Sequence, residues 1–182
     1  MMTLTLNCLR ALLVLTAVTG VVYPLLVTTI AQVAFPHQAN GSRISVGGVL
    51  VGSELFSQKF TDPKFFWPRP SAADFATVAS GASNQGFTSK KLADAVVERS
   101  RILGGTPAPD LLYASGSGLD PHISFEALQF QIPRVAEARG MSIGELKKIT
   151  AEFIEKPQLG FLGQHRVNVL RLNLALEANS KR

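Results

Sequence analysis

The stretch "ASGSGLDPHIS", residues 114–124, holds residue types that could cradle a phosphate. Such a cradle uses successive backbone N–H groups before a helix N-terminus, usually with a basic side chain nearby. The stretch lacks the Gly-Lys-Ser/Thr ending of a P-loop, and Asp120 would place a carboxylate beside the bound phosphate. We therefore predict a structural corner in which Gly116 or Gly118 adopts positive φ, with nucleotide binding as the alternative.

Other catalytic and metal-binding patterns are missing from the sequence. His37, His122 and His165 lie far apart, and no cysteine or carboxylate cluster accompanies them at metal-ligand spacing. No serine lies in a G-x-S-x-G motif. We predict no catalytic residue, no metal site and no tightly bound cofactor.

A hydrophobic run near the N-terminus places the chain at a membrane. Residues 11–35 carry no charged side chain. At about 1.5 Å per residue, a helix of this length exceeds the roughly 30 Å hydrocarbon core. A cleaved signal peptide would have an apolar core of only about 7–15 residues and a small-residue cleavage site. We predict an uncleaved transmembrane helix over residues 11–35, kinked at Pro24.

One face of this helix could contact another helix. Thr16 and Gly20 form a small-xxx-small step, with Tyr23 near the same side. Small residues are also common in membrane helices generally, so the alternative is a face without a partner.

The charges around the span predict its orientation. Arg10 precedes the apolar run, and the nearest cation after it is Arg43. The positive-inside rule then makes residues 1–10 a cytoplasmic tail and residues 36–182 extracytoplasmic. Cys8, the single cysteine, precedes the span, so residues 36–182 contain no thiol, which suits an oxidising compartment. The net charge of +5 is scattered among acidic residues without an RNA- or DNA-binding motif, so we predict no nucleic-acid partner.

We predict one α+β domain of mixed strands and about three helices after the span. Residues 44–60 indicate a strand or hairpin, and helices are expected over about 88–103, 124–139 and 142–156. Pro133 should bend the second helix, and Pro157 should end the third. The leucines of residues 166–178 alternate strictly, which favours a strand, although Ala-Leu-Glu-Ala within it suits a helix.

The stretch "FFWPRPSA" sets three aromatic rings beside Arg69. Aromatic residues and arginine are enriched among interface anchors, but buried rings more often fill a domain's own core. A guanidinium is costly to bury without acceptors. We predict that Arg69 contacts a partner subunit, with an internal brace as the alternative.

Five stretches carry a family resemblance and follow the span in order: "FFWPRPSA", "ASGASNQG", "ASGSGLDPHIS", "QIPRVAEARG" and "LGFLGQHRVNVLRLNLAL". Over nearly its full length the chain resembles the KdpC family, the C subunits of the bacterial high-affinity potassium-transporting ATPase. The departures are small. Phe125 follows Ser124 where the family usually has proline, which removes a favourable first helical residue.

The resemblance implies an accessory subunit in the bacterial inner membrane. Its implied partners are a channel-like, potassium-selective A subunit, a P-type ATPase B subunit, a small F subunit and the lipid bilayer. The family's C subunit is described as a catalytic chaperone that raises the ATP affinity of the ATPase subunit. Gln131 and Arg134 match a Gln-x-x-Arg motif that has been connected with nucleotide contact, and ATP is the only small ligand implied.

The implied nucleotide contact conflicts with the predicted topology. ATP is cytoplasmic, whereas the orientation places Gln131 and Arg134 on the other side of the membrane. Our hypothesis is a non-catalytic subunit that stabilises the pump and influences ATP affinity indirectly. The alternative is a nucleotide-binding regulator that forms a ternary complex with the ATPase subunit and ATP. A third hypothesis, a membrane-anchored hydrolase, lacks a catalytic motif.

Overall fold

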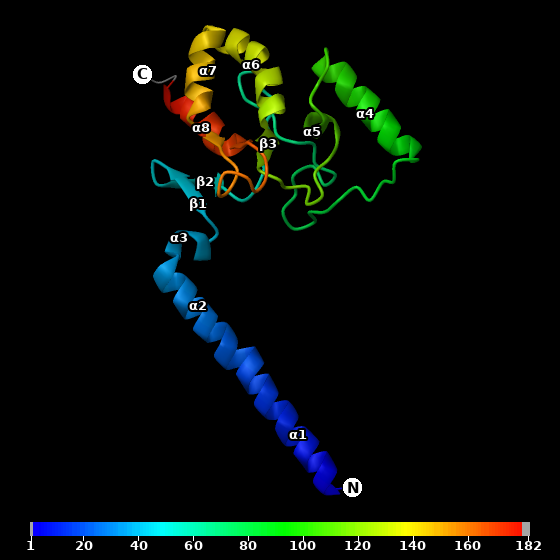
Figure 1. The fold of residues 1–182 in the computed structure, drawn as a ribbon, viewed down its shortest axis with the longest axis vertical. Coiled ribbons are helices and arrows are strands. Elements are labelled where there is room, and N and C mark those ends of the chain that lie inside the picture. The colour runs from blue at the N-terminus through cyan, green and yellow to red at the C-terminus, as the bar shows by residue number, and fades with distance from the viewer. Residues whose placement is uncertain (1, 180–182) are drawn as a thin grey trace. The chain divides into compact units, whose positions relative to one another are not determined.

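The computed structural model describes residues 2–179, which divide into two compact units between Ser53 and Glu54. Figure 1 shows a long helix at the start of the first unit and a mixture of helices and short strands in the second. The predicted α+β class, with one N-terminal apolar helix, is confirmed.

The first unit begins with a continuous helical run. It comprises α1 (Met2–Ala17), the π-helical turn η1 (Val18–Val22) and α2 (Tyr23–Ala34). The run from Met2 to Ala34 is long and apolar enough to cross a membrane, and none of its most apolar window is buried. The π turn η1 ends at Val22, two residues before Pro24, which has no N–H to donate to the preceding turn, and the kink expected there stays a prediction.

A short helix and a hairpin complete the first unit. Helix α3 spans Pro36–Ala39, and strands β1 (Arg43–Val46) and β2 (Val49–Ser53) pair antiparallel. Gly47 and Gly48 both have positive φ, as a tight two-residue hairpin turn requires. The predicted hairpin is confirmed.

Over residues 54–179, the second unit has five helices and a three-stranded antiparallel sheet in the order β3-β5-β4. Its elements are α4 (Lys90–Leu103), α5 (Pro109–Leu112), β3 (His122–Ser124), α6 (Phe125–Arg139), α7 (Ile143–Ala151), β4 (Ile154–Glu155), β5 (Arg166–Asn168) and α8 (Val169–Asn179). Helix α6 supplies most of the core through Ala127, Leu128, Ile132, Val135 and Ala136.

Three serines begin helices of this unit. The hydroxyls of Ser89, Ser124 and Ser142 accept N–H groups at the starts of α4, α6 and α7, three residues further along in each case. Each satisfies a donor that a helix start leaves free. The three helices are confirmed. However, α7 ends at Ala151, before Pro157, because β4 occupies the residues between.

The strand prediction for residues 166–178 is wrong beyond Asn168. Only Arg166–Asn168 is a strand, and α8 follows it at once. The buried side chains at Val169, Leu172, Asn173 and Leu176 recur at spacings of three and four, which is helical periodicity. The helical pattern was not recognised in the sequence because one of its buried positions is the polar Asn173, whereas the leucines alternate as in a strand.

Candidate functional site

Two side-chain amides hold the aromatic loop, residues 63–70, which lies outside the helices and strands. The Phe66 N–H donates to Asn173 Oδ1 at 2.9 Å, and Asn173 Nδ2 donates to the Phe66 carbonyl at 2.9 Å. Gln131 does the same for the next residue: it accepts from the Trp67 N–H at 2.8 Å and donates to the Trp67 carbonyl at 3.1 Å. Asn173 and Gln131, which we call the amide clamps, therefore supply the hydrogen bonds that a neighbouring strand would provide.

Arg134 extends the Gln131 clamp over the same loop. Its Nη2 donates to Gln131 Oε1 at 2.6 Å, and its Nη1 donates to the carbonyls of Pro63 at 2.6 Å and Phe65 at 3.1 Å. The guanidinium carbon lies 3.9 Å from the centre of the Trp67 ring, a cation–π contact. Burial lowers the pKa of Arg134 to about 10, so the side chain remains charged at neutral pH.

The residues of the implied nucleotide motif are thus engaged within their own domain. Gln131 is 1% exposed, and both heteroatoms of its amide are bonded to the loop. A nucleotide that used Gln131 would have to displace the Trp67 backbone and leave buried polar groups unpaired. Residues three apart on a helix lie on the same face, so Gln131 and Arg134 of the Gln-x-x-Arg pattern can hold the loop together. This geometry gives the pattern a structural role.

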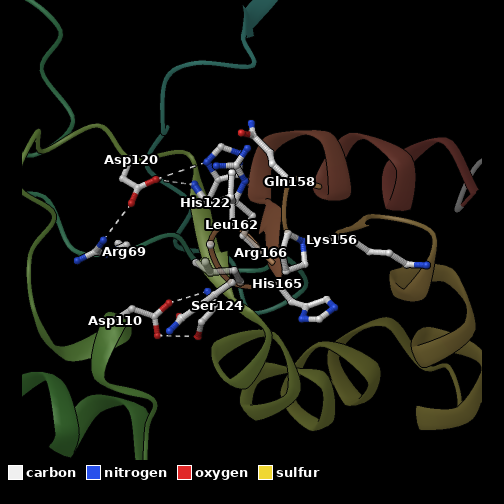
Figure 2. A pocket seen from close by; sticks show the side chains of 14 residues that line it. Arg69, Asp110, Asp120, His122, Ser124, Lys156, Gln158, Leu162, His165 and Arg166 are labelled. Carbon is white, nitrogen blue, oxygen red and sulfur yellow. Dashed lines mark hydrogen bonds and ion pairs between the residues drawn. The ribbon is translucent and has the colours of Figure 1, made fainter. Parts of the chain in front are cut away.

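A polar cleft of about 500 Å³ lies beside β3 (Figure 2). Arg69 Nη1 donates to Asp120 Oδ2 at 2.9 Å, and the ring of His122 stands 3.6 Å from Asp120 Oδ1 and 3.8 Å from Glu155 Oε2. Arg166 Nε in turn donates to Glu155 at 2.8 Å. These polar contacts link the aromatic loop, β3 and the β4–β5 pair.

Asp120 is held as a carboxylate by this arrangement. Burial by itself would raise its pKa, but hydrogen bonds from His122, and then the hydrogen bond and charge of Arg69, outweigh it and lower the pKa to about 2. Arg69 Nε is buried and has no acceptor among the described residues. Arg69 is paired with Asp120 within its own domain, and its contact with a partner subunit stays a prediction.

Two aspartates close the open edge of the sheet. Because the Val169 N–H bonds to the Pro121 carbonyl, alternate pairing turns the N–H groups of His122 and Ser124 away from β5. Asp120 accepts the first at 3.0 Å and Asp110 accepts the second at 2.7 Å. With carboxylates occupying its free donors, this edge is poorly suited to pairing with another strand.

The glycine–serine stretch 114–118 is a backbone corner at this site. Gly118 has φ of +71°, whereas Gly116 does not fall in the left-handed region. A Cβ at Gly118 would lie 2.9 Å from the Gly81 carbonyl oxygen and 3.3 Å from Ser71 Oγ. The corner thus packs against Gly81, in the stretch "ASGASNQG", which explains why a side chain is excluded at Gly118.

The three candidate contact residues of the span are accessible in this chain. Tyr23 is 63% exposed, and a Cβ on Gly20 would meet only Thr16, at 4.0 Å. The structure leaves open space around Gly20, so a partner helix on this face stays a prediction.

Comparison with known proteins identifies the family. A model described as "KdpC: K+-transporting ATPase, c chain" matches residues 5–178. The chain belongs to the KdpC family. A KdpC subunit of Sorangium cellulosum is 52% identical over 91% of this chain and 93% of its own length. Potassium-transporting ATPase KdpC subunits of Methylococcus capsulatus and Leptospira interrogans are 49% and 46% identical, each over 93% of this chain and 95% and 91% of their own lengths.

Sequence reasoning missed Asn173, the second amide clamp in this KdpC-family chain. It lies in a segment predicted as a strand, and an asparagine among leucines gives no separate signal of burial. The helical spacing of Val169, Leu172 and Leu176 could have found it, because Asn173 completes that face. Asp110 was also missed, since its role depends on a strand edge that the sequence did not predict.

Proposed function

We propose that the protein is a non-catalytic accessory subunit of a potassium-transporting ATPase. It stabilises the assembly of a channel-like A subunit, a P-type ATPase B subunit and a small F subunit in the bacterial inner membrane. Its support is the family membership, the names of the relatives and the single apolar helix from Met2 to Ala34.

In this proposal the subunit raises the ATP affinity of the ATPase subunit through contacts between subunits. The observation that carries this step is the engagement of Gln131 and Arg134 with the aromatic loop. A buried amide with both heteroatoms paired is a poor nucleotide ligand, whereas a braced loop can transmit a docking contact. The alternative is a regulator that binds nucleotide directly in a ternary complex with the ATPase subunit.

The orientation is part of the proposal and has a direct test. With Arg10 on the cytoplasmic side, the second unit lies outside the cytoplasm. Cys8 is the only cysteine, so a Cys8→Ser chain carrying the exposed Ser83→Cys has one reporter thiol. A membrane-impermeant maleimide should label it in intact spheroplasts. Labelling only after lysis would contradict this orientation and would place the second unit in the cytoplasm, where ATP is present.

The indirect effect on ATP is tested with the assembled pump. The ATPase activity of the purified complex is measured against ATP concentration, with Gln131→Ala in the subunit and Gln129→Ala on the same helix as the control. Indirect action predicts that any change in the KM for ATP accompanies a loss of domain stability. A raised KM with unchanged unfolding would favour direct contact with nucleotide.

A further inference from the structure

The connection between β4 and β5 ends in a tight, hydrogen-bonded turn. Gln158 and Leu162 exchange both backbone hydrogen bonds, at 3.0 and 2.9 Å, and the N–H of Gly160 donates to the Pro157 carbonyl at 3.1 Å. A turn with these bonds has one defined shape. Its apolar side chains, which we call the apolar tip, are Leu159, Phe161 and Leu162.

The apolar tip is exposed despite its size. Leu159 is 83% exposed, Phe161 74% and Leu162 50%. Leu162 lines the polar cleft of Figure 2, while Leu159 and Phe161 are not among the residues that line it. Large apolar side chains gathered on one fixed turn are a common feature of interaction sites.

Leu159 also occupies unfavourable backbone. Its φ is +53°, in the left-handed region that glycine and asparagine tolerate and that leucine rarely adopts. The other two residues of this segment with positive φ, Gly160 and Gly163, are glycines, which tolerate that conformation. A bulky leucine at the strained position, with its side chain in solvent, gains nothing for the isolated domain. Strain of this kind points to a function for the side chain.

The surroundings of the tip favour a partner with acidic groups. Lys156 and His165 flank the turn and are exposed, and within residues 2–179 neither forms an ion pair. The neighbouring Arg166 is matched by Glu155. An unpaired lysine beside an apolar centre is complementary to an apolar socket bordered by carboxylates or carbonyl oxygens.

We propose that the apolar tip docks into such a socket on a companion membrane subunit of the ATPase. This assignment rests on the proposed accessory role. A lipid surface requires apolar area but no particular backbone shape, whereas a shaped socket is best filled by a side chain held in place before binding. The strained, hydrogen-bonded turn therefore favours a protein partner over lipid.

The first test changes the tip without changing the backbone. Leu159→Asn removes the apolar side chain but suits the positive φ, so unfolding followed through Trp67 should be unaltered or shifted to higher temperature. The complex is purified in mild detergent through a tag on the full-length chain. Fewer companion subunits should be retained, because losing an anchor residue typically lowers affinity about thirtyfold. Phe161→Ser, outside the left-handed region, should act in the same direction.

The controls give every outcome a meaning. Phe87 is 96% exposed in another segment, and Phe87→Ser should leave retention unchanged. Full retention with both tip variants, an equal loss with Phe87→Ser, or unfolding by both tip variants would each overturn the assignment. Expression of the companion subunits without the chain tests the accessory role separately. Normal assembly in its absence would refute that role whatever the tip variants do.

A second measurement separates protein from lipid. An environment-sensitive fluorophore is attached to Gln158→Cys, an exposed position beside the intact apolar tip, in a Cys8→Ser chain in nanodiscs containing anionic lipid. A blue shift only in the assembled complex supports the socket. A blue shift in nanodiscs that hold the chain alone would assign the tip to lipid, and no shift in either would leave it without an apolar partner; both results overturn the proposal.

Discussion

Replacing Gln131 by alanine should destabilise the second unit because it opens one amide clamp. The side chain is 1% exposed and carries both hydrogen bonds to the Trp67 backbone, as well as one from Arg134. Its loss leaves an N–H, a carbonyl and part of a guanidinium without a partner. A buried group left unpaired costs about 1–3 kcal/mol, and Trp67 is only partly buried, so the total is about 3 kcal/mol.

The natural assay for this change is the fluorescence of Trp67, the only tryptophan in the chain. Its ring lies against Arg134, so its emission reports directly on the clamp. For a chain of this size, about 3 kcal/mol corresponds to a fall in Tm of about 10 °C. Gln129→Ala, on the same helix and without a bond to the loop, should change the Tm by no more than about 2 °C.

A matched variant at the other clamp sharpens the test. Asn173→Ala removes two hydrogen bonds from Phe66, which is fully buried, so its effect should equal or exceed that of Gln131→Ala. Suppose that Gln131→Ala left the Tm measured by Trp67 fluorescence unchanged, whereas Asn173→Ala lowered it. The proposal that Gln131 clamps the loop would then be refuted. The hydrogen-bonding groups of Gln131 would then be available for a ligand.

Three further predictions concern the corner, the cleft and the span. Gly118→Ala should destabilise the second unit by about 2 kcal/mol, through positive φ and the clash with Gly81, while Gly116→Ala should change it by less than about 0.5 kcal/mol in thermal unfolding; equal effects would contradict the corner. The lowered pKa of Asp120 means that its contribution to stability is complete above its ordinary pKa of 3.8 and is lost as pH falls towards about 2. Asp120→Asn should flatten acid unfolding in that window, and an unchanged profile would argue against the ion pair. Gly20→Leu should insert normally yet weaken co-purification of the complex, since the chain itself has room for the side chain; undiminished recovery would leave that face without a partner.

Local signals in the sequence predicted much of the fold. The helices that start near Ser124 and Ser142, the hairpin within residues 44–60 and the apolar span each depend on a few neighbouring residues, and each is present in the structure. The last segment could not be predicted in this way. Its burial is decided by contact with Phe66, which lies 107 residues away in the sequence. A polar residue buried by a distant backbone group looks like a surface position when only its neighbours are considered.

Several residues of the candidate site were named from the sequence, but their arrangement was not predicted. Gly118 and Asp120 were expected at a corner, and Gln131 and Arg134 entered through a family motif. The structure adds that Asp120 pairs with Arg69 and that Gln131 binds the loop on which Arg69 lies. Both pairings join segments more than fifty residues apart, so neither spacing nor composition could indicate them.

The position of the aromatic loop decides where docking should be sought. Phe66 is fully buried and Trp67 is covered by Arg134, so the rings that the sequence offered as interface anchors are largely used inside the domain. Arg69 has its principal acceptor in Asp120, and transferring it to a partner would expose that carboxylate and break the cleft. The side chains of Leu159 and Phe161, in contrast, are 83% and 74% exposed. An interface built on the apolar tip would therefore bury apolar area without unpairing charge, which is the arrangement that gives a favourable free energy of association.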